Sequence, residues 1–348
     1  MPRGDFRYSQ RLMSSTVDVV VVGATGAVGQ EMLRVLAARS FPVGRLRLVA
    51  SARSAGRTVE ALGRQITLEE PSAEVFRGAQ LALFSAGADT ARQWAPVAAA
   101  EGCLAVDNSS AFRADPDIPL VVPEVNAHRI PRPARGIVAN PNCSTIQMLV
   151  ALKPLHDAAG LVQVVVSTYQ AISGKGARAL DEYRQQASAV ARGHEAPVSV
   201  LPGVLADNLL VDWRHDASGW AEEERKMVHE SRKILELPEL LVAPTCVRVP
   251  VPNAHSESVW ARFRRPMSRD EVLDLLAAAP GVVVDRRVGP GQHPQPRDAS
   301  GRDEVFVGRV RVDADDPNAV NLWVVGDNLR KGAATNAVQI AERALGLA

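Results

Sequence analysis

The sequence predicts an α/β protein in two parts, a domain built on a parallel sheet and an α+β domain with a mixed or antiparallel sheet. A β-branched run at 17–22 passes through a glycine-rich turn into an amphipathic helix, the usual opening of a parallel α/β sheet. After about residue 150, several strands follow with few helices between them, a pattern typical of α+β domains. A length of 348 residues also suits two domains, each with its own core.

Composition excludes several classes of function. Lys+Arg 40 and Asp+Glu 39 leave a formal net charge of +1, so no global field favours nucleic acid or an anionic membrane. The three cysteines are widely spaced without a C-x-x-C pair, which argues against disulfides or a zinc site and fits a reducing compartment. No apolar run reaches the roughly 18 residues of a membrane helix. Residues 1–16 lack the apolar middle of a signal peptide, so we expect them to form a disordered extension on a cytoplasmic protein. We expect no metal.

Residues 23–29, Gly-Ala-Thr-Gly-Ala-Val-Gly, lie between the first strand and an apolar-faced helix. Glycine permits a tight turn and lets the backbone approach a pyrophosphate, which then binds free N–H groups at the start of the helix. In this setting nucleotide binding explains the glycines better than a purely structural turn. We therefore predict a Rossmann-like dinucleotide-binding domain with contacts from Gly23, Thr25, Gly26, Ala27 and Val28.

The strand at 46–50 ends in two hydroxyls and a guanidinium, Ser51, Arg53 and Ser54. A loop that binds NAD usually carries an acidic side chain here to hold the ribose 2′-hydroxyl, and none is present. Hydroxyls and a guanidinium suit a 2′-phosphate instead, so the sequence predicts NADP rather than NAD. The alternative is that Arg53 is simply one exposed arginine among many.

Two further short strands, at 81–84 and 104–106, fit the same parallel sheet. The first leads into small residues, among them Ser85 and Gly87, that allow a cofactor to lie against the backbone. The second leads into the polar segment 107–113, and open α/β sheets place ligands after the carboxyl ends of their strands. Arg113 in this segment fits a two-pronged contact to phosphate or carboxylate, and equally a surface ion pair.

Cys143 lies where a short apolar run at 137–139 meets an apolar helix at 146–152. Free N–H groups and the positive end of the helix dipole favour the thiolate, which is the nucleophilic form of cysteine. A neighbouring imidazolium would lower the pKa of the thiol further. The alternative interpretation is a small buried hydrophobic residue, which most free cysteines are.

The second part of the chain begins with a strand at 161–168. A helix to about 192, a long irregular connection over 193–220 and a helix at 222–235 follow, and Glu223 and Lys226 lie three apart on one face of that last helix. Strands at 242–251 and 256–263 are expected to form a hairpin through 252–255. Arg248 and His255 lie on this unit, and histidine suits proton transfer near neutral pH, although a lone histidine in a turn is more often without a catalytic role. The remaining expected elements are a helix at 267–278, strands at 305–312 and 320–325, and a final helix at 329–345 packed on the first domain.

Five motifs in this order resemble the aspartate-semialdehyde dehydrogenase family. The resemblance spans about 17–348, and its motifs are GATGAVG at 23–29, SARS at 51–54, NPNCST at 140–145, VRVPV with HSES at 247–251 and 255–258, and DNLRKGAA at 327–334. It implies reversible, phosphate-dependent conversion of L-4-aspartyl phosphate into L-aspartate 4-semialdehyde with NADP. The product enters the aspartate-family pathway towards lysine, threonine, methionine and diaminopimelate.

The resemblance also assigns roles to residues. It implies Cys143 as nucleophile, His255 as acid/base and Gln170 as the residue that orients the reacting group. Substrate contacts follow from Arg113, Asn142 and Lys226 for phosphate, Arg248 for the α-carboxylate and Glu223 for the amino group. Residues near the nicotinamide are Ser173, Gly174 and Asn328. It further implies a homodimer formed through the second domain, with tetramers left open, and a split cofactor domain: 17–141 with 328–348, around a catalytic and dimerisation domain at 142–327.

Two features depart from the family pattern. Lys175 stands where a small residue is usual, and the connection at about 199–220 is atypical. Two alternative functions also stay open. One is a reductase of N-acetylglutamyl phosphate, which uses similar cysteine and NADP chemistry but whose acetylated substrate offers no positive amine to Glu223. The other is a non-catalytic NADP-binding relative.

Overall fold

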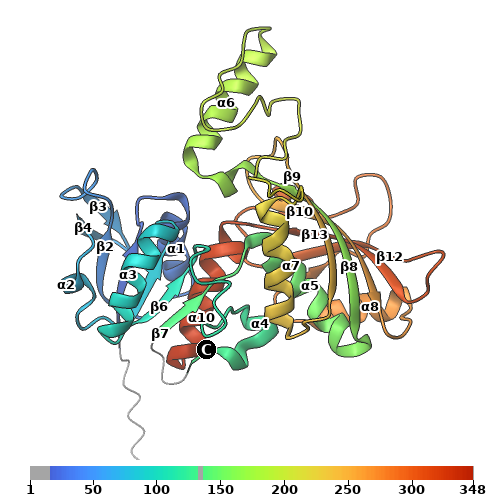
Figure 1. Cartoon of the computed structure of the whole chain (residues 1–348), viewed down its shortest axis with the longest axis horizontal. Coiled ribbons are helices and arrows are strands. Elements are labelled where there is room, and N and C mark those ends of the chain that lie inside the picture. Colours follow the sequence, from blue (N-terminus) through green and yellow to red (C-terminus); the bar gives the residue numbers. More distant parts are fainter. Residues whose placement is uncertain (1–15, 132–135, 348) are drawn as a thin grey trace, which may run out of the picture.

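The computed structural model describes residues 16–131 and 136–347, which form two sheets with helices packed on them (Figure 1). The expected disordered extension lies, apart from Thr16, outside the described residues. The first sheet has the strand order β3-β4-β2-β1-β5-β6-β7, and its neighbours are parallel except for β3 with β4. Its strands are β1 Val17–Val22, β2 Val43–Val49, β3 Thr58–Ala61, β4 Arg64–Glu69, β5 Leu81–Phe84, β6 Leu104–Asp107 and β7 Gly136–Ala139.

Helices cover both faces of this sheet, which explains the continuous apolar runs in its central strands. Alternate residues of β1 point to opposite faces: Val19 and Val21 pack with α1 and α10, whereas Val20 and Val22 pack with α2 and α3. The final helix is thus part of the first core, as its apolar face predicts. The helices of this region are α1 Ala27–Ala38, α2 Ala73–Phe76, α3 Ala88–Ala100, α4 Pro123–Asn126, η1 Ala127–Arg129, η3 Arg330–Ala334 and α10 Thr335–Leu345.

The second sheet is mixed, in the order β11-β12-β13-β10-β8-β9, and α5, α7 and α8 cover one of its faces (Figure 1). The predicted fold class, a parallel-sheet domain joined to an α+β domain, is therefore confirmed. The strands are β8 Leu161–Gln170, β9 Leu241–Arg248, β10 His255–Phe263, β11 Val282–Val284, β12 Val305–Val312 and β13 Ala319–Gly326. The helices are α5 Cys143–Ala159, η2 Ile172–Lys175, α6 Ala177–Ala191, α7 Glu222–Leu235, α8 Arg269–Ala278 and α9 Pro296–Ala299. The domain limits given above stay predictions.

The predicted hairpin between the strands at 242–251 and 256–263 is wrong. β9 pairs in parallel with one edge of β8, and β10 pairs antiparallel with the other edge. The connection crosses the end of β8, where the N–H groups of Ile172 and Ser173 donate to the carbonyls of Val251 and Pro252. A local pattern of two strands and a turn cannot show that a third strand, distant in sequence, satisfies the backbone groups of both. This insertion brings the ends of three strands together at the site described below.

Helix α6 projects away from both sheets, and the irregular connection returns from it to the second sheet (Figure 1). The connection is held by buried polar groups of α6: Glu182 accepts hydrogen bonds from the N–H groups of Val200 and Leu201, and Gln186 accepts one from Leu205. It rejoins the sheet where Leu210 and Arg248 exchange backbone hydrogen bonds of 3.1 and 2.7 Å. In the part of the chain that the structure describes, no helix is both long and apolar enough to cross a membrane.

Candidate active site

A cavity of about 360 Å³ lies where the loops of the first sheet meet the strand ends of the second. It collects nearly all of the residues expected to contact the substrate, although they come from loops, helices and strands far apart in the sequence. The predicted site residues that line it are Val28, Arg113, Asn142, Cys143, Gln170, Ser173, Gly174, Glu223, Lys226, Arg248 and Asn328.

Cys143 is the first residue of α5, directly after the N-cap Asn142. The Asn142 side chain accepts hydrogen bonds from the N–H groups of Ser144 and Thr145 at 2.9 and 3.3 Å, which fixes the start of the helix. On the other side, a Cβ on Gly332 would lie only 2.7 Å from the Cys143 Cβ. Glycine at 332 therefore lets the π-helical segment η3 pass close to the nucleophile.

The expectation of an ionised Cys143 thiol is wrong for the protein without substrate. Burial, followed by the nearby Glu223 carboxylate, raises the pKa of the Cys143 thiol to about 12. Arg113, Arg248 and the N–H of Ser144 act in the opposite direction but do not outweigh these effects. The helix terminus was thus correctly located, whereas the cost of burying an anion beside a carboxylate was not visible in the sequence.

His255 is completely buried behind Gly174 and, alone among the predicted catalytic and substrate-binding residues, does not line the cavity. The Ala171 N–H donates to its Nδ1 at 2.9 Å, so in the neutral ring the proton is placed on Nε2. Nε2 has no hydrogen-bond partner among the described residues and lies 3.4 Å from where a Cβ on Gly174 would be. Burial and the Arg248 charge hold the pKa of His255 well below its ordinary value. This shift favours the neutral ring, which the hydrogen bond from Ala171 arranges as a donor through Nε2.

The register of three neighbouring strands brings their ends together, and with them Gln170, Arg248 and His255. Gln170 ends β8 and pairs with Arg248, which ends β9, while His255 begins β10 on the other side of β8. Gln170 is buried, and its Nε2 donates to Thr168 Oγ1 at 3.3 Å. Its place between the arginine and the histidine follows from the strand order, not from sequence spacing.

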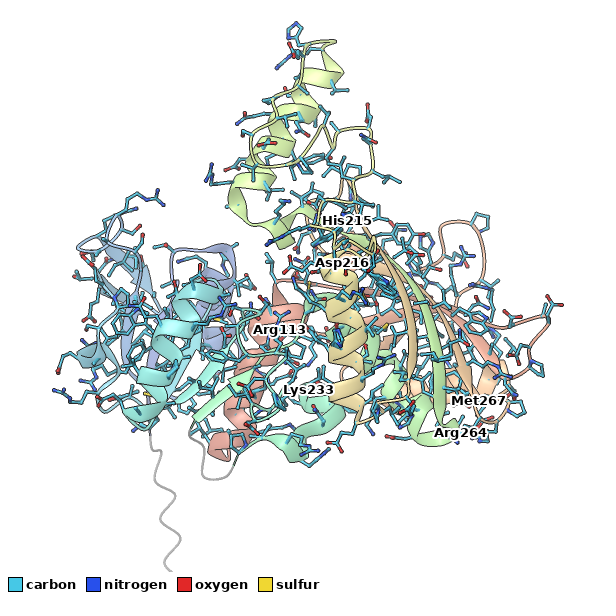
Figure 2. The ribbon with its side chains drawn as sticks, in the orientation of Figure 1. Arg113, His215, Asp216, Lys233, Arg264 and Met267 are labelled. Atoms are coloured by element: carbon cyan, nitrogen blue, oxygen red, sulfur yellow. The ribbon has the colours of Figure 1, made fainter. Side chains whose placement is uncertain are left out.

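Arg113 lies between the first sheet and α7 (Figure 2). Its Nη1 donates to Glu230 at 3.1 Å, its Nη2 donates to the Asn108 carbonyl at 3.0 Å, and its buried Nε has no partner among the described residues. Glu230 also accepts from the N–H of Asn142 at 2.6 Å. Lys226 lines the same cavity, and its Nζ donates to Glu223 at 3.2 Å. Of the two alternatives for Arg113, an anion site and a surface ion pair, its position in the cavity favours the anion site.

Arg248 is almost completely buried, and it is held from three sides. Its Nη1 donates to the Ala171 carbonyl at 2.7 Å, its Nε donates to Asp212 at 3.3 Å, and its guanidinium lies over the Trp213 ring at 4.7 Å. A guanidinium fixed in this way has one edge defined for a planar partner such as a carboxylate. The arrangement suits recognition of one end of a small anionic substrate.

A second cavity, of about 330 Å³, lies at the carboxyl ends of β1, β2 and β5. This is the switch point of the parallel sheet, where such folds bind nucleotides. Gly23, Thr25, Gly26, Ser51 and Ser85 line it, whereas Arg53 and Ser54 lie on the exposed side of the turn that follows β2. The start of α1 carries no acidic side chain and no side-chain cap, so its N–H groups are available to an anion.

The first turn of α1 also connects the two cavities. Gly26 lines the cavity at the switch point, and Val28, two residues later, lines the one around Cys143. Gly87 caps α3 beside this path with φ 89°, a conformation that favours glycine. At the other end, Ser173 and Asn328 hydrogen-bond to each other at 2.9 Å next to Cys143. The residues present thus fit a dinucleotide that extends from the glycine turn towards the cysteine.

Comparisons with known proteins identify the family. The family models for the semialdehyde dehydrogenase NAD binding domain and dimerisation domain match residues 18–132 and 152–331. An aspartate-semialdehyde dehydrogenase from Aquifex aeolicus (strain VF5) is 48% identical over 329 residues, which is 93% of this chain and 96% of the relative. This chain belongs to the aspartate-semialdehyde dehydrogenase family.

Solved structures of the family agree with this assignment. Aspartate-semialdehyde dehydrogenase II from Vibrio cholerae, solved in complex with ASA, has a TM-score of 0.91 and 44% identity, with 95% of this chain and 99% of that chain covered. The enzyme from Candida albicans, solved with NADP, has a TM-score of 0.73 and 26% identity over 94% and 98%. These relatives do not favour the two alternative functions left open by the sequence.

Two carboxylates of the site were missed from the sequence. Glu230 lies seven residues after Glu223 and four after Lys226, so helix periodicity alone places all three on one face of α7. Asp212 lies in the irregular connection, where no periodicity exists, and nothing in the sequence indicated its contact with Arg248. Both residues act on a predicted arginine rather than lining the cavity themselves.

Proposed function

We propose that the chain is an NADP-dependent aspartate-semialdehyde dehydrogenase that converts L-4-aspartyl phosphate into L-aspartate 4-semialdehyde and phosphate, reversibly, through a cysteine thioester. The observation that carries the proposal is the single cavity that joins Cys143 to four cations, Arg113, Lys175, Lys226 and Arg248, and borders the cleft at the glycine turn. The family relatives described above support the same reaction. It belongs to biosynthesis of the aspartate family of amino acids.

The nucleophile is Cys143. Its sulfur attacks the C4 carbonyl carbon of aspartyl phosphate, the bond from that carbon to the phosphate oxygen breaks, and a thioester remains. Because the pKa of the free thiol is raised, its proton leaves in the course of the attack rather than in the resting protein, and the departing phosphate oxygen takes it up. The departing phosphate carries its charge to Arg113 and Lys226, and Asn142, which precedes Cys143, lines the same cavity.

Reduction of the thioester requires a hydride, which the nicotinamide cofactor supplies when bound. Hydride addition would place negative charge on the carbonyl oxygen of the thioester, to which the neutral His255 would donate its Nε2–H. The carbon–sulfur bond would then break, which returns the sulfur to Cys143 and releases the aldehyde. Gln170 lies between His255 and Arg248 and orients the reacting group. Ser173 and Asn328, which hydrogen-bond to each other beside Cys143, limit where the ring of the cofactor is held.

The other end of the substrate is a zwitterion, and opposite charges in the cavity suit it. Arg248 takes the α-carboxylate and Glu223 takes the ammonium group. A substrate with an acetylated amine offers no positive charge to the buried Glu223 carboxylate, which disfavours N-acetylglutamyl phosphate.

NADP is the proposed cofactor. Ser51, Arg53 and Ser54 follow β2 without an acidic side chain among them, and the Arg53 side chain is exposed beside the cleft residue Ser51. Hydroxyls and a guanidinium there suit a 2′-phosphate. The solved relative with NADP supports the same choice.

A homodimer in the cytoplasm completes the proposal, and a tetramer is compatible with it. The face of the second sheet opposite its helices carries exposed apolar side chains, Val165 at 41%, Tyr169 at 36% and Leu241 at 54%, and Tyr169 packs on Trp323. An apolar face of this kind on a matched dimerisation domain is suited to a second copy of the chain. The three cysteines are all free, which fits a reducing compartment.

The test is phosphate-dependent reduction of NADP with L-aspartate semialdehyde by the wild-type protein and by Cys143→Ala. The variant should keep its unfolding temperature and lose turnover, and Cys103→Ala, which changes a buried cysteine outside the cavity, should keep both. Turnover by Cys143→Ala close to that of the wild type would refute the mechanism. Activity of the wild type on N-acetylglutamate semialdehyde in place of L-aspartate semialdehyde would refute the substrate.

A further inference from the structure

Asp212 connects the two features that depart from the family pattern. It lies in the irregular connection, its side chain is fully buried, and its Oδ2 lies 2.9 Å from the Lys175 Nζ and 3.3 Å from the Arg248 Nε. Lys175 follows the cavity residue Gly174 and lines the cavity itself. The unusual lysine and the unusual connection therefore meet at one carboxylate, next to the arginine proposed to bind the substrate carboxylate.

The charges around the cavity show what this contact changes. Each of the three proposed substrate cations has a carboxylate partner: Arg113 has Glu230, Lys226 has Glu223 and Arg248 has Asp212. Three such pairs carry no net charge. Lys175 is a fourth cation and shares Asp212 with Arg248, so it leaves one positive charge at this end of the cavity.

A buried carboxylate beside Arg248 has two opposing effects. It fixes the guanidinium, because Nε and Nη2 both face Asp212 while Nη1 donates to the Ala171 carbonyl. It also cancels the charge of Arg248 and repels an incoming carboxylate, an effect that is strong where water is excluded. Lys175 neutralises the charge of Asp212 from its other side. The repulsion of an incoming carboxylate is thereby removed, while Asp212 still orients the Arg248 guanidinium.

We propose that Asp212 and Lys175 form a charge-balancing pair of positioning residues, in which Asp212 orients Arg248 and Lys175 restores the net positive charge that the substrate α-carboxylate needs. The inference rests on the proposed function. It assigns a role to the atypical connection, which carries Asp212 into the site.

The test compares Lys175→Met, Lys175→Arg, Asp212→Asn and the double variant Lys175→Met with Asp212→Asn. Lys175→Met should raise the KM for L-aspartate semialdehyde by about tenfold or more and change kcat less than about threefold, because uniform binding is lost. Lys175→Arg keeps the charge and should stay within about threefold of the wild-type KM. Asn at 212 keeps an oxygen that accepts from Arg248, so the double variant should reverse most of the rise in KM that Lys175→Met causes.

The KM for phosphate provides an internal comparison, because phosphate is assigned to the Arg113 end of the cavity and should be affected less. The matched control is Lys153→Met, which removes a partly exposed lysine of α5 that pairs with Asp157 away from the cavity. An unchanged KM in Lys175→Met overturns the inference, and so does a double variant whose KM rises by the product of the single effects. If the Asp212 variants do not fold, the contrast between Lys175→Met and Lys175→Arg decides: equal KM values overturn it. A wild type without turnover would instead refute the proposed function.

Discussion

At the scale of single residues, the environments of Cys143 and His255 determine the protonation states of these two side chains. Both were found in the sequence, but His255 is completely buried and Cys143 is only partly exposed, and desolvation disfavours the charged form of each. Two neutral side chains do not form a thiolate–imidazolium ion pair. The reactive thiolate is therefore a state that substrate binding and attack must produce, and its neighbours determine how readily it forms.

The first prediction concerns Glu223, which raises the pKa of the Cys143 thiol after burial. Glu223→Gln should lower that pKa and increase the thiolate fraction, so alkylation of Cys143 at pH 7.5 should become about three to ten times faster. Labelling followed by mass spectrometry separates Cys143 from the fully buried Cys103 and Cys246. Glu222→Gln, which removes an exposed carboxylate one position away, is the control. A slower reaction in Glu223→Gln would contradict the electrostatic assignment.

The second prediction concerns His255, whose folded-state pKa lies well below its ordinary value because of burial and Arg248. The unfolded state binds the proton more readily, so the contribution of this residue to the free energy of unfolding is present above about pH 6.5 and declines as the pH falls below it. Nitrogen NMR of the labelled ring should show a neutral imidazole with its proton on Nε2 throughout pH 6–8. His255→Gln should remove this part of the pH dependence. A ring that titrates near pH 6.5 would be incompatible with the hydrogen bond from Ala171.

At the scale of elements, the site depends on pieces that hold each other in place. The strand order puts β8 between β9 and β10. The side chains at the adjoining strand ends, Gln170, Arg248 and His255, therefore lie close together. The loop after β6 is held by α7: the Lys233 Nζ donates to the carbonyls of Arg113, Asp115 and Ile118, and Figure 2 shows Lys233 on the same side of α7 as Arg113. One helix thus carries both a partner for the phosphate-site arginine and the anchor of its loop.

The third prediction follows from that anchor. Lys233→Met leaves three carbonyl groups without their donor and should lower the free energy of unfolding by about 1–3 kcal/mol. Because the loop carries Arg113, the KM for phosphate should rise more than the KM for L-aspartate semialdehyde. Urea unfolding and steady-state kinetics measure the two effects. His229→Gln, on an exposed position of the same helix, should change neither. Equal effects on both KM values would argue against a local role of the loop.

At the scale of the whole molecule, the C-terminal segment ties the two cores together. Segment η3 passes beside Cys143 and leads into α10, which packs in the first core. Lys331 within η3 is 1% exposed and donates to Glu124, Asn336 and Gln339 at 2.6, 2.9 and 2.7 Å. A buried cation surrounded by acceptors fixes the end of the chain against α4 more specifically than apolar packing alone would.

The fourth prediction concerns this pair. Lys331→Met should lower the free energy of unfolding by about 3–5 kcal/mol because it leaves the Glu124 carboxylate buried and unpaired, and adding Glu124→Gln should recover much of the loss.

Burial raises the pKa of Glu124, but the charge and hydrogen bond of Lys331 outweigh it and hold that pKa below its ordinary value. The stabilisation is therefore present above about pH 4.5 and lost as the pH falls through the folded pKa. Urea unfolding at pH 7 and pH 4 measures both effects. Equal losses in the single and double variants would exclude a paired charge as the cause.

The sequence by itself determined the features that are local in the chain. The strand, glycine turn and helix at the start, the cysteine at a helix terminus and the helix with Glu223 and Lys226 on one face all appear in the structure where they were expected. Their signals are periodicity and the conformational needs of glycine, and both act over a few neighbouring residues. The motif set was also sufficient to indicate the family and most residues of the cavity.

Only the tertiary structure decided how distant segments meet. The insertion of β8 into the expected hairpin, the contact of Asp212 with Lys175 and Arg248, and the neutral state of Cys143 and His255 all depend on groups far apart in the sequence. Backbone pairing is satisfied by whichever strand lies alongside, and the charge of a buried group depends on desolvation and on every neighbour that folding brings near. Strand pairing and the charge of a buried group are not properties of a short stretch of chain, so the local sequence pattern does not predict them.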